Sequence, residues 1–143
     1  MEIFADIDGL VKVYQLEKMV RSHRRCMFQG KEITPDYADI MHRICVEVTA
    51  DKNMHIARRT ELFVAFLVFQ PIALFEKKVR YNDAVKNYAK RSMGLSDRQI
   101  NHYKENLLFL YYNDKRMHAC VRDALQQLKS YQTGQDTEKE SIR

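Results

Sequence analysis

The sequence predicts an all-α protein, folded as a single compact bundle of about six helices that contains a helix-turn-helix-like pair. The chain has 143 residues, of which 45% are hydrophobic and 30% charged, which is the size and composition of one globular domain. Four glycines and two prolines are too few for the many tight turns of a β-sandwich or barrel. We therefore expect residues 1–132 to form one helical domain and residues 133–143, which have almost nothing to bury, to form a disordered tail.

The first two helices are predicted from apolar spacing and from signals at their ends. Apolar residues between Ile7 and Val20 recur at helical intervals and predict a helix over 7–28, which Gly30 ends. Thr34 followed by Pro35 predicts the next start, because a threonine hydroxyl caps free amides and a proline at the first helical position loses no hydrogen bond.

The segment 54–69 is predicted to be the central helix, because it becomes apolar on all sides after Glu61. A buried strand over 62–69 is the alternative. The apolar run from 62 to 75 is interrupted by Pro71 and is shorter than the roughly 18 residues of a membrane span, so we expect no membrane segment. The run also suggests a homodimer, unless its phenylalanines fill the core of a monomer.

The segment 82–112 reads as two helices joined by a short turn. Asn82 is a plausible cap for the first helix, and Gly94 ends it. Ser96 followed by Gln99 predicts a capping box, so a second helix begins there and continues to residue 112. Asp114 or the residue before it caps a last helix.

The positive charge of the chain is concentrated beside this helical pair. The formal net charge is +5, and residues 77–104 hold eight basic and two acidic residues, a local charge of +6. Such a surplus attracts polyanions, so we predict a nucleic-acid-binding protein, with DNA favoured over RNA. The predicted binding residues are Lys77, Lys78, Arg80, Lys86, Lys90, Arg91, Arg98, Gln99, Asn101, His102 and Lys104.

The predicted mode of binding is that of a DNA-reading helix-turn-helix. Ala89, Gly94 and Ile100 take the places of the small residue, the turn glycine and the inner residue, although the turn is one residue longer than usual. Arg98 and Asn101 would then reach base edges, while the lysines of the first helix would bind phosphates.

Three other interpretations remain open. In the first, the two helices are merely consecutive helices of an α-helical domain, and the lysines only solvate its surface without binding nucleic acid. The basic face would bind only the backbone of DNA or RNA if no side chain reads bases. The chain would be a protein interaction module, a homo-oligomer or an adaptor, if its aromatic residues serve a partner. A second basic run, residues 18–25, is explained by the favourable position of cations at the end of a helix.

The sequence gives no indication of an enzyme. It lacks a glycine-rich phosphate loop and a nucleophile paired locally with a base, so we expect no catalytic residues, no cofactor and no small-molecule substrate. His42 with Cys45, and His118 with Cys120, are too few to supply the four converging ligands of a zinc site. Three widely spaced cysteines and an acidic amino terminus favour a reduced, cytoplasmic protein.

Overall fold

The computed structural model describes the backbone of residues 6–28 and 30–141, and the side chains of residues 6–22 and 30–131. Within these ranges the protein contains helices and no strand, which confirms the all-α fold class. The helices are α1 (Ile7–Phe28), α2 (Pro35–Val48), α3 (Met54–Phe69), α4 (Ile72–Phe75), α5 (Asp83–Ser92), α6 (Asp97–Lys104), α7 (Leu107–Asn113) and α8 (Lys115–Ser141).

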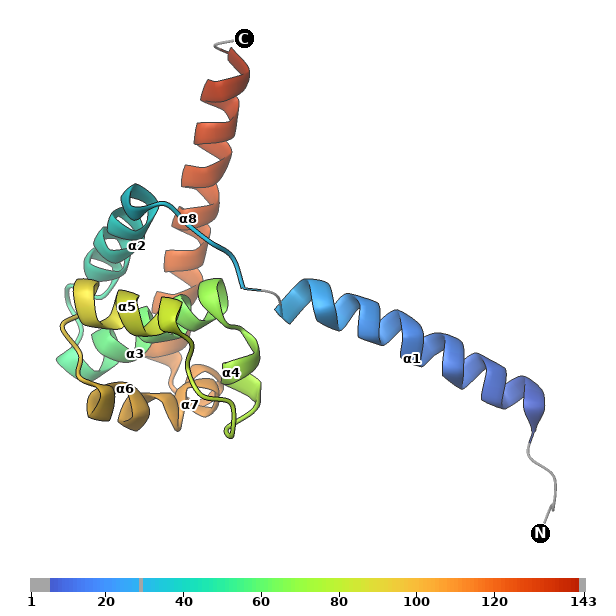
Figure 1. The fold of residues 1–143 in the computed structure, drawn as a ribbon. Helices are drawn as coiled ribbons and strands as arrows, with labels where there is room; N and C mark the ends of the chain where they lie inside the picture. Colours follow the sequence, from blue (N-terminus) through green and yellow to red (C-terminus); the bar gives the residue numbers. More distant parts are fainter. Residues whose placement is uncertain (1–5, 29, 142–143) are drawn as a thin grey trace.

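Helices α2 to α8 pack together around α3, while α1 extends away from them (Figure 1). The central helix α3 contacts α2, α4, α5, α6, α7 and α8. The predicted single compact bundle includes the helix over 7–28, whereas in the structure this helix lies outside the group of packed helices α2 to α8. The periodicity of residues 7–28 specified a helix but carried no information about what covers it.

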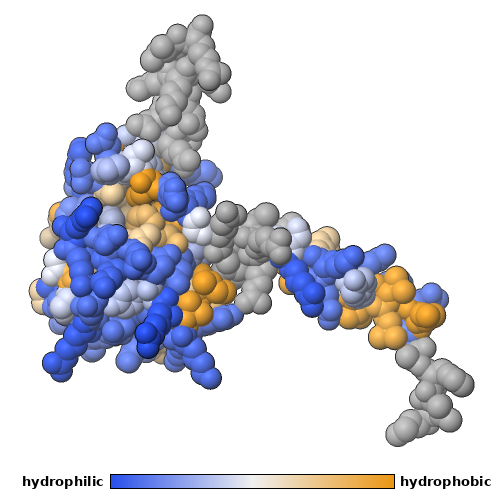
Figure 2. Space-filling view, in the orientation of Figure 1, coloured by the Kyte–Doolittle hydropathy of each residue, from blue (hydrophilic) through white to orange (hydrophobic). Residues whose placement is uncertain are grey.

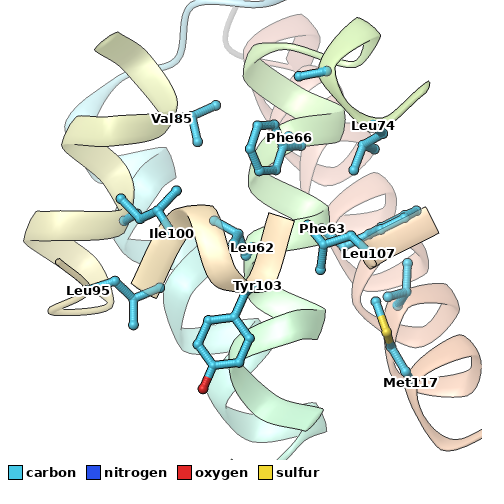
Figure 3. Close-up of a cluster of buried hydrophobic side chains, with 13 residues drawn as sticks. Leu62, Phe63, Phe66, Leu74, Val85, Leu95, Ile100, Tyr103, Leu107 and Met117 are labelled. Atoms are coloured by element: carbon cyan, nitrogen blue, oxygen red, sulfur yellow. The ribbon is translucent and has the colours of Figure 1, made fainter. Parts of the chain in front are cut away.

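The core has two parts, which lie on different sides of α3. Leu62, Phe63 and Phe66 point into the larger part, together with side chains from α4 to α8 (Figure 3). Val64 and Ala65 belong to the smaller part, with residues of α2, α5 and α8. Residues 62–69 are therefore helical, and the alternative prediction of a strand is wrong. The core of one chain buries Phe63 and Phe66, whereas Phe69 is half-buried and Phe75 is exposed. The homodimer stays a prediction.

Most of the helix starts confirm the predicted caps. Thr34 accepts a hydrogen bond from the amide of Tyr37, and Asn82 accepts one from the amide of Val85. Asp114 accepts hydrogen bonds from two amides in the first turn of α8. These starts were predictable because capping depends on residues only three positions apart.

The helix that we predicted over 96–112 is two helices, because α6 ends at Lys104 and α7 begins at Leu107. Asn106, at the junction, has a low helix propensity. Beyond the junction, the ring of Tyr111 stacks on Phe63 of α3 with 4.8 Å between ring centroids. Packing against α3 therefore decides the direction of α7. This break and the short helix α4 raise the number of helices above the predicted six.

The last helix continues past the end of the predicted domain. Its backbone is helical to Ser141, through most of the segment 133–143 that we predicted to be a disordered tail. The segment contains no proline, and adding residues to an existing helix costs little. The division of the chain at residue 132 stays a prediction.

The backbone that follows α1 is held against the end of α3. The amide of Lys31 donates a hydrogen bond to the carbonyl oxygen of Val68 at 2.8 Å. A Cβ atom at Gly30 would lie 2.0 Å from the carbonyl oxygen of Phe69, so only glycine fits at this crossing. Among the described residues, no helix combines the length and the apolar character needed to cross a membrane.

Candidate nucleic-acid interface

Helices α5 and α6 are joined by a tight turn whose geometry follows from its residues. Gly94 adopts the left-handed conformation, with φ of +66°, and the amide of Leu95 donates to the carbonyl of Ala89 at 3.0 Å. Ser96 and Gln99 then form the predicted capping box. Ala89, Leu95 and Ile100 are buried, so the inner side of the pair is fixed against the core and its outer side is available for binding.

The predicted binding residues lie in α5, in α6 and in the loop 76–82 that precedes α5. Figure 2 shows a largely hydrophilic surface over α5 and α6. The residues Lys77, Lys78, Arg80, Lys90, Arg91, Arg98, Asn101 and His102 are exposed, and Lys86, Gln99 and Lys104 are half-buried.

Asp97, in the first turn of α6, links that helix to α5. Its carboxylate accepts a hydrogen bond from the hydroxyl of Tyr81 at 2.6 Å and pairs with the ammonium of Lys90 at 3.1 Å. These two hydrogen bonds, and the nearby charge of Lys86, lower the pKa of Asp97. Burial and the bond to Asp97 raise the pKa of Tyr81 to about 12. The structure thus brings the two α5 lysines and the start of α6 to one side, and Lys90 compensates the charge of Asp97.

Besides Lys90, two more of the predicted binding residues, Lys104 and Gln99, already hydrogen-bond to the protein itself. The ammonium of Lys104 donates to the carbonyl oxygens of Lys77 and Val79, and burial lowers the pKa of Lys104. These hydrogen bonds connect the loop 76–82 to α6. The side chain of Gln99 accepts a hydrogen bond from the amide of Ser96 at 3.0 Å. A direct role of either residue in nucleic-acid binding would compete with these bonds.

Arg98 and Asn101 keep exposed side chains on α6. The exposed ring of His102 packs edge-on against Tyr103, with 5.4 Å between centroids and an interplanar angle of 67°. These three residues form the outward part of α6, as the predicted reading helix requires, and two of them carry amide or guanidinium donors suited to base edges.

A group of basic residues from the first turns of α3, which was not predicted from the sequence, surrounds Tyr103. The Tyr103 hydroxyl lies 2.9 Å from Nδ1 of His55 and accepts a hydrogen bond from Arg58 at 3.3 Å. The guanidinium of Arg59 lies 5.8 Å from the centroid of the Tyr103 ring. This group extends the basic surface from α6 to the start of α3. The pattern HIARR at 55–59, just before the apolar run, was the signal that could have revealed it.

A second polar group is buried around Glu61 of α3. Its carboxylate lies 2.6 Å from Nδ1 of His42 on α2 and accepts a hydrogen bond from the hydroxyl of Tyr88 on α5 at 2.7 Å. Burial raises the pKa of Glu61, although both hydrogen bonds oppose the shift. A cavity of about 250 Å³, which includes Arg58 and Ser92 in its lining, lies beside this group. These contacts of Glu61 connect α2, α3 and α5.

The histidine and cysteine pairs considered for metal binding have other neighbours. Nδ1 of His118 lies 3.0 Å from the carbonyl oxygen of Tyr111, and the thiol of Cys120 contacts the carbonyl of Val48. In the part of the chain that the structure describes, no three metal-ligating side chains gather at one place. No family model matches the chain, and neither curated proteins nor solved structures give a significant match.

Proposed function

We propose that this protein binds DNA through the outer side of α5 and α6 together with the loop 76–82. The observation that carries the proposal is that basic side chains from these three segments lie exposed around α6, where Asp97 is already paired with Lys90. A cluster of this kind lowers the free energy of bound phosphates and releases counterions from DNA.

The residues of this surface bind either phosphates or bases, according to where they lie. Lysines of α5 and of the loop bind phosphates and set the position of the protein on the duplex. Arg98 and Asn101 face the bases, since guanidinium and amide groups form paired hydrogen bonds with guanine and adenine. The major groove, about 12 Å wide, admits an α-helix, whose diameter with side chains is about 10–12 Å.

Salt dependence tests the proposed class of ligand. Fluorescence anisotropy of a labelled random duplex should show affinity falling by about 10³-fold or more between 50 and 200 mM salt, because six or more phosphate contacts release counterions. Absence of binding at 50 mM salt would contradict the proposal.

Paired variants separate base reading from backbone binding. Lys86→Ala with Lys90→Ala should weaken binding to every duplex alike, whereas Arg98→Ala or Asn101→Ala should lower affinity by about 5- to 150-fold only on a preferred site. Arg122→Ala is the matched control, since it removes a charge from an exposed position on α8. If every α5 and α6 variant lost the same affinity on preferred and random duplexes, the protein would bind only the DNA backbone.

A second candidate function, a helical interaction module with no role in nucleic-acid binding, is favoured by a different observation. The described apolar side chains of α1 are exposed, and no other part of the chain that the structure describes covers them. Exposed apolar surface of this kind marks a site for a partner.

A further inference from the structure

Helix α1 presents apolar side chains to solvent along its described length. Every described residue from Ile7 to Ser22 is exposed except Gly9, which is half-buried. The exposed fraction of the large apolar side chains ranges from 49% for Val11 to 73% for Ile7. The helix extends away from the bundle, which leaves room for a second helix beside it (Figure 1). Because a helix in a protein derives most of its stability from packing an apolar face, a second helix on this surface would stabilise α1.

One face of α1 has the spacing of a coiled coil. Gly9, Val13, Leu16 and Val20 follow one another at intervals of four, three and four residues, and we call these four residues the α1 seam. In a heptad written abcdefg, the two valines occupy a positions, and the glycine and the leucine occupy d positions. The preceding a position is Asp6, which lies before the helix begins. In parallel coiled coils, valine at a with leucine at d favours two strands.

The surface of the seam has the shape that a coiled-coil contact requires. Val13, Leu16, Glu17 and Val20 border a shallow apolar groove, together with Arg21. The first four of these residues occupy successive a, d, e and a positions, and in a parallel pair such a set forms the hole for a knob at d. The side chain that would fill this hole is Leu16 of a second copy, which lies level with Leu16 of the first.

The residues that border the seam determine the orientation of the second helix. Lys12 occupies a g position and Glu17 the e position of the next heptad. In a parallel, in-register pair these two positions meet across the contact, so Lys12 of each copy lies beside Glu17 of the other. An antiparallel pair sets g beside g and e beside e, and it offers neither residue an opposite charge. The other bordering residues, Leu10 and Met19, are exposed apolar side chains that widen the contact. The remaining charged residues between 7 and 22, which are Asp8, Lys18 and Arg21, lie at outer positions.

A second apolar stripe, on the opposite side of α1, is shorter than the seam. Ile7, Val11 and Tyr14 are as exposed as the seam residues, but the same spacing continues to Lys18 and Arg21. A helix pair built on this stripe would have to bury those two cations in its contact, which is unfavourable. The ammonium of Lys18 also lies 5.0 Å from the centroid of the Tyr14 ring, so the helix itself covers part of the stripe. The seam is therefore the side that stays uncharged from Gly9 to the end of the described side chains.

We propose that α1 is a self-association arm, which packs its seam against the seam of a second copy of this chain in a parallel, two-stranded coiled coil. The pair buries apolar surface that the described part of one chain leaves exposed, and its two-fold symmetry requires only one kind of surface. Because the two helices run in the same direction, both bundles lie at the same end of the pair. The inference rests on α1 alone and does not depend on whether α5 and α6 bind DNA.

The first test measures association of the full chain by sedimentation velocity between 1 and 100 μM. We expect a species of twice the 17.0 kDa mass of one chain. Leu16→Glu should raise the dissociation constant by about tenfold or more, because it places a carboxylate inside the contact in both copies. Gln15→Glu is the matched control, since it adds the same charge at the neighbouring exposed residue, which faces away from the seam.

Val11→Glu tests the second stripe in the same way, and it should leave the dissociation constant unchanged. A chain that stays monomeric at 100 μM would overturn the proposal. So would a loss of association in Val11→Glu as large as that in Leu16→Glu, because the contact would then include the second stripe. Thermal denaturation followed by circular dichroism checks that the bundle of every variant is folded.

The second test exchanges the charges that border the seam and establishes the orientation. Lys12→Glu and Glu17→Lys each place like charges at both bordering contacts of a parallel pair, so each single variant should associate about 4- to 30-fold more weakly than the wild type. The double variant, Lys12→Glu with Glu17→Lys, restores opposite charges and should associate as the wild type does. An equimolar mixture of the two single variants should likewise associate more strongly than either alone. Single variants that associate as the unchanged chain does, or a double variant that does not recover, would overturn the parallel pair.

Discussion

Helices α1 and α3 are both rich in apolar residues, and they lie in opposite environments. Side chains of α3 such as Leu62 and Phe66 are inaccessible to solvent, whereas Leu10 and Leu16 of α1 keep more than half of their surface exposed. The two helices also differ in where their charged residues fall. In α3 the charges gather in the first half, up to Glu61, while in α1 they are spread along the helix. The core helix α3 therefore has a continuous apolar half, whereas apolar and charged residues alternate along α1.

This difference separates two roles that apolar residues have in this protein. The side chains of α3 stabilise the fold of one chain, because they pack against helices from α2 to α8. Those of α1 are exposed to solvent and contribute little to the packing of the described residues. Substitutions in the two helices should thus differ in their effect on the free energy of unfolding, which is large for α3 and small for α1.

The largest expected effect is that of truncating Phe66, whose side chain is fully buried. Phe66→Ala should lower the free energy of unfolding by about 3–5 kcal/mol, because it removes apolar contacts and leaves a cavity. Val11→Ala in α1 should change it by less than about 0.5 kcal/mol. Urea denaturation followed by circular dichroism measures both, and a comparable loss in the two variants would show that α1 packs within the chain.

A smaller effect is expected at Glu61, the buried charge of α3. Glu61→Ala should lower the free energy of unfolding by about 2–3 kcal/mol, because the hydroxyl of Tyr88 and the ring of His42 lose their shared partner. Asp8→Ala, at an exposed position of α1, is the control and should have little effect. An unchanged free energy of unfolding for Glu61→Ala would mean that water replaces the carboxylate as the hydrogen-bond partner of Tyr88 and His42.

The same carboxylate predicts a pH dependence of stability. Burial raises the pKa of Glu61 above its ordinary value, so the folded protein holds the proton more tightly than the unfolded chain does. The contribution of this group to stability is complete below the unfolded pKa of about 4.3 and is lost as pH rises through the raised folded pKa. Glu61→Gln should remove this dependence. Denaturation at a series of pH values from 4 to 8 tests the expectation, and parallel curves for the two proteins would contradict it.

The smallest expected effect is at the amino-terminal end of α6, where residues three positions apart form the cap. Ser96→Ala should lower the free energy of unfolding by about 1 kcal/mol, because the amide of Gln99 loses the hydroxyl that caps it. Ser130→Ala, on the exposed side of α8, should leave stability unchanged or slightly higher. An unchanged melting temperature for Ser96→Ala would show that solvent caps α6 equally well.

These regions also show which features the sequence could predict. Helix starts at Thr34, Asn82 and Ser96 follow from residues at short separation, and they were predicted correctly. The break near Asn106 and the position of α1 depend on contacts between distant residues, so spacing alone did not predict them.

The same limit applies to the candidate site. The local sequence was enough to propose α5 and α6, since the basic residues and the turn signals are close together in the chain. The groups around Tyr103 and Glu61 join residues 19 to 48 positions apart, and a pattern search along the chain does not bring them together.

The proposed DNA-binding surface is tested most directly by NMR, with the full chain labelled with ¹⁵N and titrated with a duplex of about 20 base pairs at low salt. Amide shifts that change should cluster in residues 77–104, with neighbouring changes at 55–59, and α2 should be unaffected. Changes confined to the basic residues 18–25 of α1, or an absence of changes in α6 under saturating DNA, would contradict the proposed surface.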